Sequence, residues 1–169
     1  MMNHGSNTTA QWRPSTQAAS SDEHSQADVC FLLVEDNDDH ALLVERTLCR
    51  SSHEAKITRV SDGEEALQYL RGEGAYADRS LPDVVLMDLN LPKYSGHEVL
   101  AAIRDDPTLA CLPVVVLSSS NAVVDRNNAY RGHANSYLVK PSDFQRFRSM
   151  INQVATYWGS WNEPPACFD

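Results

Sequence analysis

The chain has 169 residues, of which 42% are hydrophobic and 22% are charged, a length and composition typical of one globular domain. Its formal net charge of −9 excludes a general role in binding the phosphate backbone of nucleic acids. No apolar run approaches the roughly 18 residues that predict a transmembrane helix, and the four cysteines lack the C-x-x-C spacing of zinc sites, so we expect reduced thiols and a cytoplasmic location.

The two ends of the chain differ from its centre. Residues 1–28 are rich in Ser, Thr, Asn and Gln and contain no Leu, Ile, Val or Phe, so they predict a disordered tail. Residues 159–169 are too few for a second domain. We therefore expect one folded domain over residues 29–158, flanked by an N-terminal and a C-terminal tail.

Five short apolar runs within this domain predict β-strands. Continuous runs rich in Val and Leu are typical of strands that are buried on both faces, as in a parallel sheet covered by helices. The runs are Val29–Val34, Ala55–Val60, Val84–Met87, Val114–Leu117 and Ser136–Val139.

Helical patterns separate and follow these runs. Acidic residues open the first two, at Asp38–Asp39 and near Asp62. Apolar residues mark the third and fourth over 99–103 and 123–130. The fifth is expected to begin at Ser142 as its cap and to face the sheet through Phe144, Phe147, Ile151, Val154 and Trp158. Five strand–helix repeats predict an α/β fold with a doubly wound (βα)5 parallel sheet.

Polar residues follow four of the predicted strands. Glu35 and Asp36 follow the first, Asp88 the third, Ser118 ends the fourth, and Lys140 follows the fifth. Ligands of open α/β sheets bind at the carboxyl ends of the strands, near the point where the strand order reverses. In the order 2-1-3-4-5, strands one and three are neighbours, so these side chains are expected to converge at one edge.

Converging carboxylates repel one another and need positive charge nearby. Lys140 supplies one charge, and a hard divalent cation such as Mg²⁺ suits an all-oxygen set of ligands. Asp88 beside a metal ion is a candidate nucleophile for phosphoryl transfer, because carboxylates attack phosphoryl groups to form acyl phosphates. The sequence has no Gly-rich phosphate loop, so a nucleotide is a poor candidate for the phosphoryl donor.

The motifs V-E-D-N (34–37), M-D-L-N-L-P (87–92), L-S-S (117–119) and Y-L-V-K-P (137–141) together resemble the receiver domain of two-component response regulators. The resemblance covers about residues 29–158 and implies a flavodoxin-like fold with strand order 2-1-3-4-5. It implies that Asp88 accepts a phosphoryl group from a phosphohistidine of a sensor histidine kinase. It also implies a response regulator that signals through protein partners or onward phosphotransfer, and that is no enzyme beyond its own phosphorylation and dephosphorylation.

The resemblance assigns further roles position by position. Asp36 is the expected direct Mg²⁺ ligand, Glu35 acts through water, and Asp88 and the main-chain carbonyl of Asn90 complete the protein ligands. Ser118 resembles the switch hydroxyl and Tyr137 the aromatic side chain that moves with it. The resemblance implies that Lys140 pairs with the phosphoryl group and that the Lys140–Pro141 peptide bond is cis.

A narrower resemblance concerns the segment Tyr69–Tyr76 and the Trp-bearing tail after the fifth helix. Both are similar to stand-alone receivers paired with phytochrome-type histidine kinases, which makes such a kinase the expected partner. A second apolar stripe on the fifth helix, at Met150, Tyr157 and Trp161, is either covered by the tail or forms a homodimer face. We expect the homodimer.

Two alternatives use the same residues differently. A Mg²⁺-dependent phosphohydrolase with an Asp nucleophile, as in haloacid dehalogenase-like enzymes, places a second Asp two residues later, where this sequence has Asn90. A pseudo-receiver would bind a partner without phosphate. The six histidines form no spaced pair, so we expect them at the surface or in loops: His4, His24, His40, His53, His97 and His133.

Overall fold

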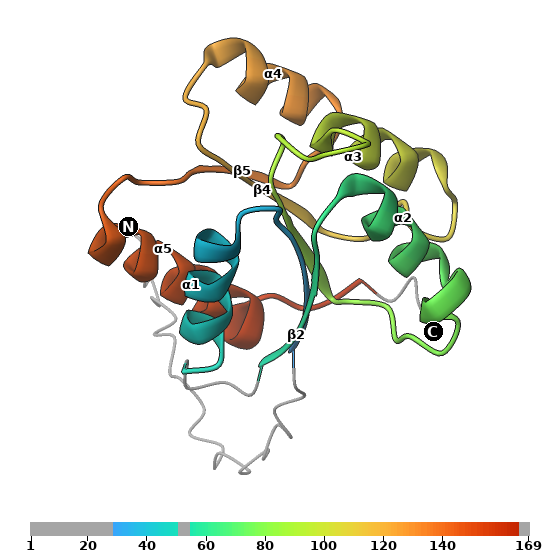
Figure 1. Cartoon of the computed structure of the whole chain (residues 1–169), viewed down its shortest axis with the longest axis horizontal. Coiled ribbons are helices and arrows are strands. Elements are labelled where there is room, and N and C mark those ends of the chain that lie inside the picture. The colour runs from blue at the N-terminus through green and yellow to red at the C-terminus, as the bar shows by residue number, and fades with distance from the viewer. Residues whose placement is uncertain (1–28, 51–54, 166–169) are drawn as a thin grey trace, which may run out of the picture.

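The computed structural model describes residues 29–50 and 55–165, which form a five-stranded parallel sheet between two layers of helices (Figure 1). The strand order is β2-β1-β3-β4-β5, so the predicted fold class and strand order are confirmed. The strands are β1 (Val29–Val34), β2 (Ala55–Val60), β3 (Val84–Met87), β4 (Val114–Ser118) and β5 (Ser136–Val139).

Helices α1 and α5 cover one face of the sheet, and α2, α3 and α4 cover the other (Figure 1). Successive side chains of a strand point to opposite faces, so Leu32 and Val34 of β1 pack on the α2–α4 side while Phe31 and Leu33 pack on the α1–α5 side. The helices are α1 (Asp38–Leu48), α2 (Gly63–Arg71), α3 (Gly96–Asp105), α4 (Val123–Arg131) and α5 (Phe144–Thr156), with short turns η1 (Gly74–Tyr76) and η2 (Tyr157–Trp161).

Side-chain caps fix where four of the helices begin. Asn37, Asp62 and Ser95 accept backbone N–H groups at the starts of α1, α2 and α3, which satisfies donors that a helix leaves unpaired. The expected cap of α5 is wrong by one residue. Asp143, and not Ser142, accepts the Arg146 N–H at 2.8 Å, because the helix begins one residue later than expected.

Two further expectations about the last helix and the turn before it are wrong. Phe144 is 58% exposed, because it is the first residue of α5, whereas Phe147 and Ile151 on the same stripe are buried. The Lys140–Pro141 peptide is not cis, since the described residues contain no cis bond. The trans form is the more stable isomer of an X–Pro bond by about 0.5–1 kcal/mol. With this bond trans, the Lys140 side chain contacts Glu35 and Asp88.

The loop after α2 is held by hydrogen bonds to the helix. The Arg79 guanidinium donates to the carbonyls of Tyr69 and Leu70, which lie in the last turn of α2. The Tyr76 hydroxyl donates to Glu65 Oε1 at 2.6 Å. This hydrogen bond lowers the pKa of the Glu65 carboxyl and raises the pKa of Tyr76 to about 12.

Arg104, near the end of α3, joins several loops at the end of the sheet where the strands begin. Its guanidinium donates to the carbonyls of Ala110, Leu112 and His133 at 2.8–3.1 Å and to Asn135 Oδ1 at 3.0 Å. One side chain therefore connects α3 with the segments that lead into β4 and β5.

The predicted N-terminal tail lies outside the described residues, as do residues 51–54 and 166–169. The domain boundaries expected at residues 29 and 158 remain predictions, although helical structure continues in η2 up to Trp161. Within the described ranges, no helix combines the length and apolar character that crossing a bilayer requires.

Candidate functional site

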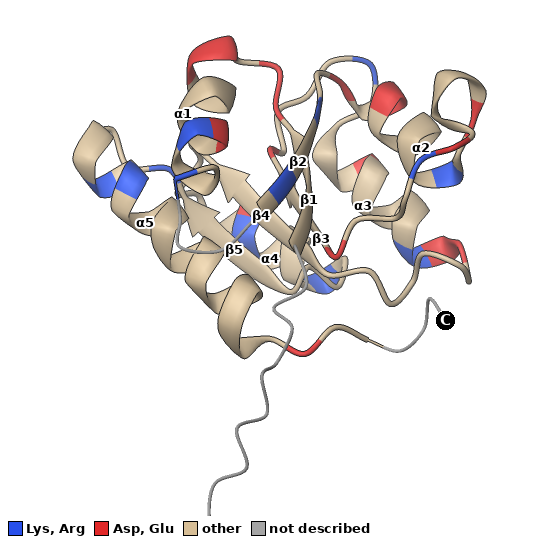
Figure 2. Ribbon diagram, turned by 90° about the horizontal axis from the view of Figure 1, so that it is seen from below, with Lys and Arg blue, Asp and Glu red and all other residues tan. Residues whose placement is uncertain are grey.

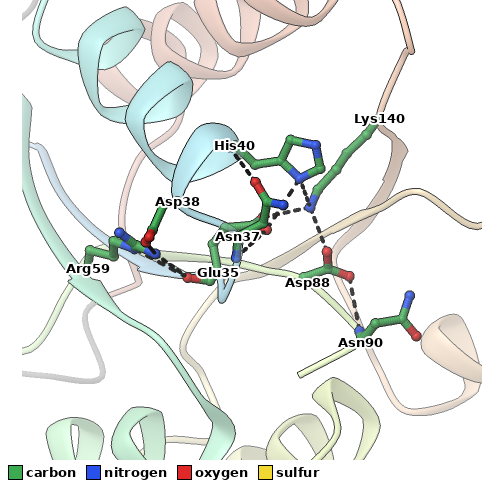
Figure 3. A network of polar contacts seen from close by, with 8 residues as sticks. All are labelled: Glu35, Asn37, Asp38, His40, Arg59, Asp88, Asn90 and Lys140. Atoms are coloured by element: carbon green, nitrogen blue, oxygen red, sulfur yellow. Dashed lines mark hydrogen bonds and ion pairs between the residues drawn. The ribbon is translucent and has the colours of Figure 1, made fainter. Parts of the chain in front are cut away.

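Three charged side chains meet in the protein interior at the carboxyl edge of the sheet. Lys140 Nζ lies 2.6 Å from Glu35 Oε2 and 2.5 Å from Asp88 Oδ2 (Figure 3). The side chains of Lys140, Glu35 and Asp88 are 3%, 1% and 9% exposed. The sequence prediction that residues far apart in the chain converge here is met for these three.

Backbone pairing beyond the strand ends sets this convergence. The Asp88 N–H donates to the Val34 carbonyl at 3.0 Å, and the Lys140 N–H donates to the Ser118 carbonyl at 2.8 Å. The sheet ladder therefore continues past β3 and β5 and holds Asp88 and Lys140 beside the neighbouring strand ends.

The loop between β1 and α1 is held from two directions. Glu35 Oε1 accepts the Asn37 N–H at 3.4 Å and lies 3.4 Å from His40 Nδ1. From the neighbouring strand β2, Arg59 donates through Nε and Nη2 to the Glu35 carbonyl at 3.3 and 3.2 Å. Its Nη2 also lies 2.7 Å from Asp38 Oδ1 (Figure 3). Both the carboxylate and the carbonyl of Glu35 thus have partners within the protein.

The second oxygen of Asp88 and its backbone are also constrained. Oδ1 accepts the Asn90 N–H at 3.0 Å, so the Asp88 side chain turns back onto its own loop. A Cβ atom at Gly96 would lie 2.4 Å from the Asp88 carbonyl oxygen. The start of α3 therefore approaches the Asp88 backbone at a distance that only glycine permits.

Ser118 and Tyr137 lie on neighbouring strands and are connected through Ser120. The Ser118 hydroxyl, fully buried, accepts the Ser120 N–H at 3.1 Å. The Tyr137 hydroxyl donates to the Ser120 carbonyl at 2.9 Å, and its side chain is directed inward at 8% exposure. Ser120 also donates to Asp125 of α4, so this short chain of contacts runs from β4 to α4.

Asp36 is exposed and takes no part in the cluster around Lys140. In residues 29–50 and 55–165, no group of three or more His, Cys, Asp or Glu side chains is arranged to hold a metal ion. Mg²⁺, however, takes only one or two carboxylates and completes its shell with waters and other oxygens. The expected donors here are all oxygens, which suits Mg²⁺. The ligand set of Glu35, Asp36, Asp88 and the Asn90 carbonyl remains a prediction.

Two residues of the network were not identified from the sequence. His40 was expected at the surface or in a loop, but it lies in the first turn of α1 against Lys140 and Glu35. Arg59 lies outside the motifs that the sequence analysis identified. The sequence offered only the place of His40 in the first turn of the helix that follows the acidic pair, which does not say where its side chain points.

A groove between α1 and α5 opens beside this cluster. Its volume is about 720 Å³, and His40 lines it together with Pro141 and Ser142, which follow Lys140. Three arginines and one aspartate lie along it, with two exposed apolar side chains, Leu42 and Phe144. Figure 2 shows basic positions on both helices, within a chain of net charge −9. The arginines of the groove are Arg46, Arg50 and Arg148.

The predicted dimer stripe is only partly exposed. Tyr157 and Trp161, both in η2, are 53% and 76% exposed, whereas Met150 is half-buried against the α1–α5 core. Met150 and Tyr157 line a second groove of about 760 Å³ beside β5, which Pro165 also lines.

Comparison with known proteins identifies relatives over most of the chain. The family described as "Response regulator receiver domain" matches residues 31–152. A probable methanogenesis regulatory protein, FilR2 of Methanothrix harundinacea, is 45% identical over 136 residues, covering 80% of this chain and 86% of that protein. Response regulator Rcp1 of Synechocystis sp. is 36% identical over 138 residues, covering 82% and 93%.

Solved structures give the same result. The phosphorylated cyanobacterial phytochrome response regulator RcpA superposes with a TM-score of 0.80 at 41% identity, covering 83% of this chain and all of that one. A structure of Rcp1 in its Mn²⁺-bound form has a TM-score of 0.78 at 35% identity, covering 82% and 99%.

Proposed function

The chain belongs to the response regulator receiver family, and we propose that its Asp88 carboxylate accepts the phosphoryl group. The observation that carries this proposal is the position of Lys140 Nζ, which contacts Asp88 and Glu35 together in the interior. A buried ammonium at this point pairs with the acceptor carboxylate before the reaction and is in reach of a phosphoryl group attached to it. The phosphorylated form of RcpA supports the proposal by similarity.

The proposed reaction is a displacement at phosphorus. One carboxylate oxygen of Asp88 forms a bond to phosphorus while the bond from phosphorus to the imidazole nitrogen of the donor breaks, and the leaving imidazole is neutral once it holds one proton. Phosphoryl transfer depends mainly on positioning and on neutralising charge on the phosphoryl oxygens. Lys140 supplies a fixed positive charge for this purpose, and the Asn90 N–H orients the Asp88 side chain.

We propose that Mg²⁺ is the resident cofactor, held by Asp36, Asp88 and the Asn90 carbonyl, with Glu35 acting through water. When bound, Mg²⁺ supplies positive charge to the phosphoryl oxygens. The Mn²⁺-bound form of Rcp1 supports a divalent metal site of this kind. Removal of divalent ions with a chelator should therefore stop labelling of Asp88.

Ser118 and Tyr137 are the proposed switch. A phosphoryl group on Asp88 would attract the Ser118 hydroxyl, which is now occupied as the acceptor of the Ser120 N–H. Because the Tyr137 hydroxyl is bonded to the same residue, a shift of Ser120 would be transmitted to β5 and α4.

Phosphorylation with a small donor tests the proposal. Incubation with acetyl phosphate and Mg²⁺ should label the chain at Asp88, and Asp88→Asn should abolish labelling. Asp78→Asn, at an exposed aspartate in the loop between α2 and β3, is the matched control and should label normally. Undiminished labelling of Asp88→Asn would refute the assignment, and repeated turnover of small phosphomonoesters would favour a phosphohydrolase instead.

A sensor histidine kinase is the proposed donor, of the phytochrome type that the description of RcpA supports. We also propose a cytoplasmic location for this chain, shared with that kinase. The groove between α1 and α5 is the face that we assign to the kinase, since it borders the Lys140 cluster and carries exposed apolar and basic side chains.

Comparing the kinase with acetyl phosphate as phosphoryl donors distinguishes binding of the kinase from the transfer step itself. Leu42→Ala and Phe144→Ala should slow phosphotransfer from the kinase but leave labelling by acetyl phosphate unchanged, because acetyl phosphate needs no docking face. Tyr94→Ala, at a 45% exposed aromatic residue before α3, is the control. Equal transfer from the kinase to all three variants would contradict this role of the groove.

We also propose a homodimer through Met150, Tyr157 and Trp161. The high exposure of Tyr157 and Trp161 supports this face. Trp161→Ala should raise the dimer dissociation constant measured by sedimentation, whereas Tyr94→Ala should not. A wild-type chain that sediments as a monomer at all concentrations would contradict the proposal.

A further inference from the structure

His40 lies where the groove between α1 and α5 meets the buried ion cluster. Its Nδ1 atom is 3.4 Å from Lys140 Nζ and 3.4 Å from Glu35 Oε1 (Figure 3). Its ring meets that of Phe147 edge to face, with centroids 5.9 Å apart and planes at 90°. The side chain is 39% exposed and lines the groove. One imidazole thus contacts the ammonium on its inner side and solvent on its outer side.

The backbone of His40 is anchored to the same loop. Its N–H donates to Asn37 Oδ1 at 2.9 Å, and the Asn37 N–H lies 3.4 Å from Glu35 Oε1. The imidazole is therefore presented from the capped start of a helix, with the Phe147 ring packed against it edge to face.

The three neighbours of the ammonium differ in what the reaction does to them. A lysine ammonium has three N–H donors, and here its neighbours are Glu35, Asp88 and His40. Once Asp88 carries the phosphoryl group, the negative charge moves from its carboxylate to the phosphoryl oxygens, and Lys140 must follow it. Glu35 and His40 are the two neighbours of the ammonium that the reaction leaves unchanged, so they can keep it aligned while its third partner changes.

We propose that His40 is a positioning residue that holds the Lys140 ammonium toward Asp88 during phosphoryl transfer. This inference rests on the proposed function of Asp88. In this role Nδ1 is the acceptor of a Lys140 N–H, with the ring proton on Nε2, and this polar contact, rather than the volume of the ring, carries the effect.

Replacement of His40 by side chains with and without a polar atom at the δ position tests the inference. His40→Leu fills similar space without that atom, whereas His40→Asn keeps one on the same carbon branch. At saturating acetyl phosphate and Mg²⁺, His40→Leu should lower the maximal rate of Asp88 labelling about threefold to tenfold, the range expected for one modest hydrogen bond. His40→Asn should recover most of that loss.

The control is Tyr94→Ala, which truncates an exposed aromatic side chain outside the groove and should label at the wild-type rate. The Mg²⁺ concentration for half-maximal labelling should stay within about twofold in every variant, because the contact acts on Lys140 rather than on the metal. Thermal unfolding is measured alongside, and His40→Ala takes the place of His40→Leu if the leucine variant unfolds.

Each outcome decides the question. A wild-type rate for His40→Leu overturns the inference, and so does a His40→Asn rate as low as that of His40→Leu, which would make ring volume the cause. Absence of labelling in the wild-type chain would instead overturn the proposed function itself, on which the inference rests.

Discussion

The buried lysine is expected to contribute far more to stability than an exposed lysine with the same number of partners. Lys140→Met removes the cation between two carboxylates whose side chains are 1% and 9% exposed. Breaking a buried ion pair by removing one partner costs about 3–5 kcal/mol, because a charge is left buried without compensation. For a domain of this size, each kcal/mol lowers the melting temperature by about 2–4 °C, so the expected shift is about 10 °C.

Lys93→Met is the matched control. Lys93 also bridges two carboxylates, at 2.9 Å to Asp62 Oδ2 and 2.8 Å to Glu64 Oε2, but its side chain is 54% exposed. Water screens such a pair, so its loss should change stability little. Both variants are unfolded by heating at pH 7 with EDTA present, so that no divalent cation replaces the missing ammonium. Equal midpoints for Lys140→Met and Lys93→Met would refute the reasoning that burial sets the size of the effect.

Three further variants probe local contacts. The hydrogen bond from Tyr76 lowers the pKa of Glu65, so its stabilisation is present above about pH 4.3, the unfolded value, and is lost as the pH falls through the folded value. Tyr76→Phe should therefore be less stable than wild type at pH 7 by about 0.5–1.5 kcal/mol, and the difference should shrink as the pH falls below about 4.3; a difference that stays the same at every pH would contradict this. Gly96→Ala should cost about 1–3 kcal/mol in urea unfolding and slow the labelling of Asp88, since the new Cβ would lie 2.4 Å from the Asp88 carbonyl oxygen. Asn37→Ala should cost about 1 kcal/mol through loss of the α1 cap, and unchanged unfolding would show that the cap contributes nothing.

The strands and the main cluster could be predicted because they depend on short-range patterns and simple topology. The run Val84–Met87 is buried on both faces, and a continuous apolar run of that length is readable as a strand. Parallel strands end at one edge, so Glu35, Asp88 and Lys140 were expected together from their places at the strand ends, and they meet there.

Other features depend on distances in space that cannot be deduced from the spacing of residues along the chain. The reach of Arg59 across from β2 to the Glu35 carbonyl requires knowledge of strand register, and the contact of His40 with Lys140 requires the packing of α1 against α5. Helical periodicity indicated the buried stripe of α5 but not where the core ends, so Phe144 was assigned to the interior. Ser142 and Asp143 are both residue types that favour the N-cap position, so residue preference alone cannot decide which of them caps α5.

The bonding of Arg104 has a mechanical consequence. A single planar group with five N–H donors engages acceptors from the two loops that lead into β4 and β5, so the starts of these two strands are held together at the end of the sheet opposite Asp88. Lysine at this position would leave several of those carbonyls unsatisfied. Displacements that begin at Asp88 are therefore expected in α4 and at the carboxyl end of β5 rather than at the starts of β4 and β5, which Arg104 holds.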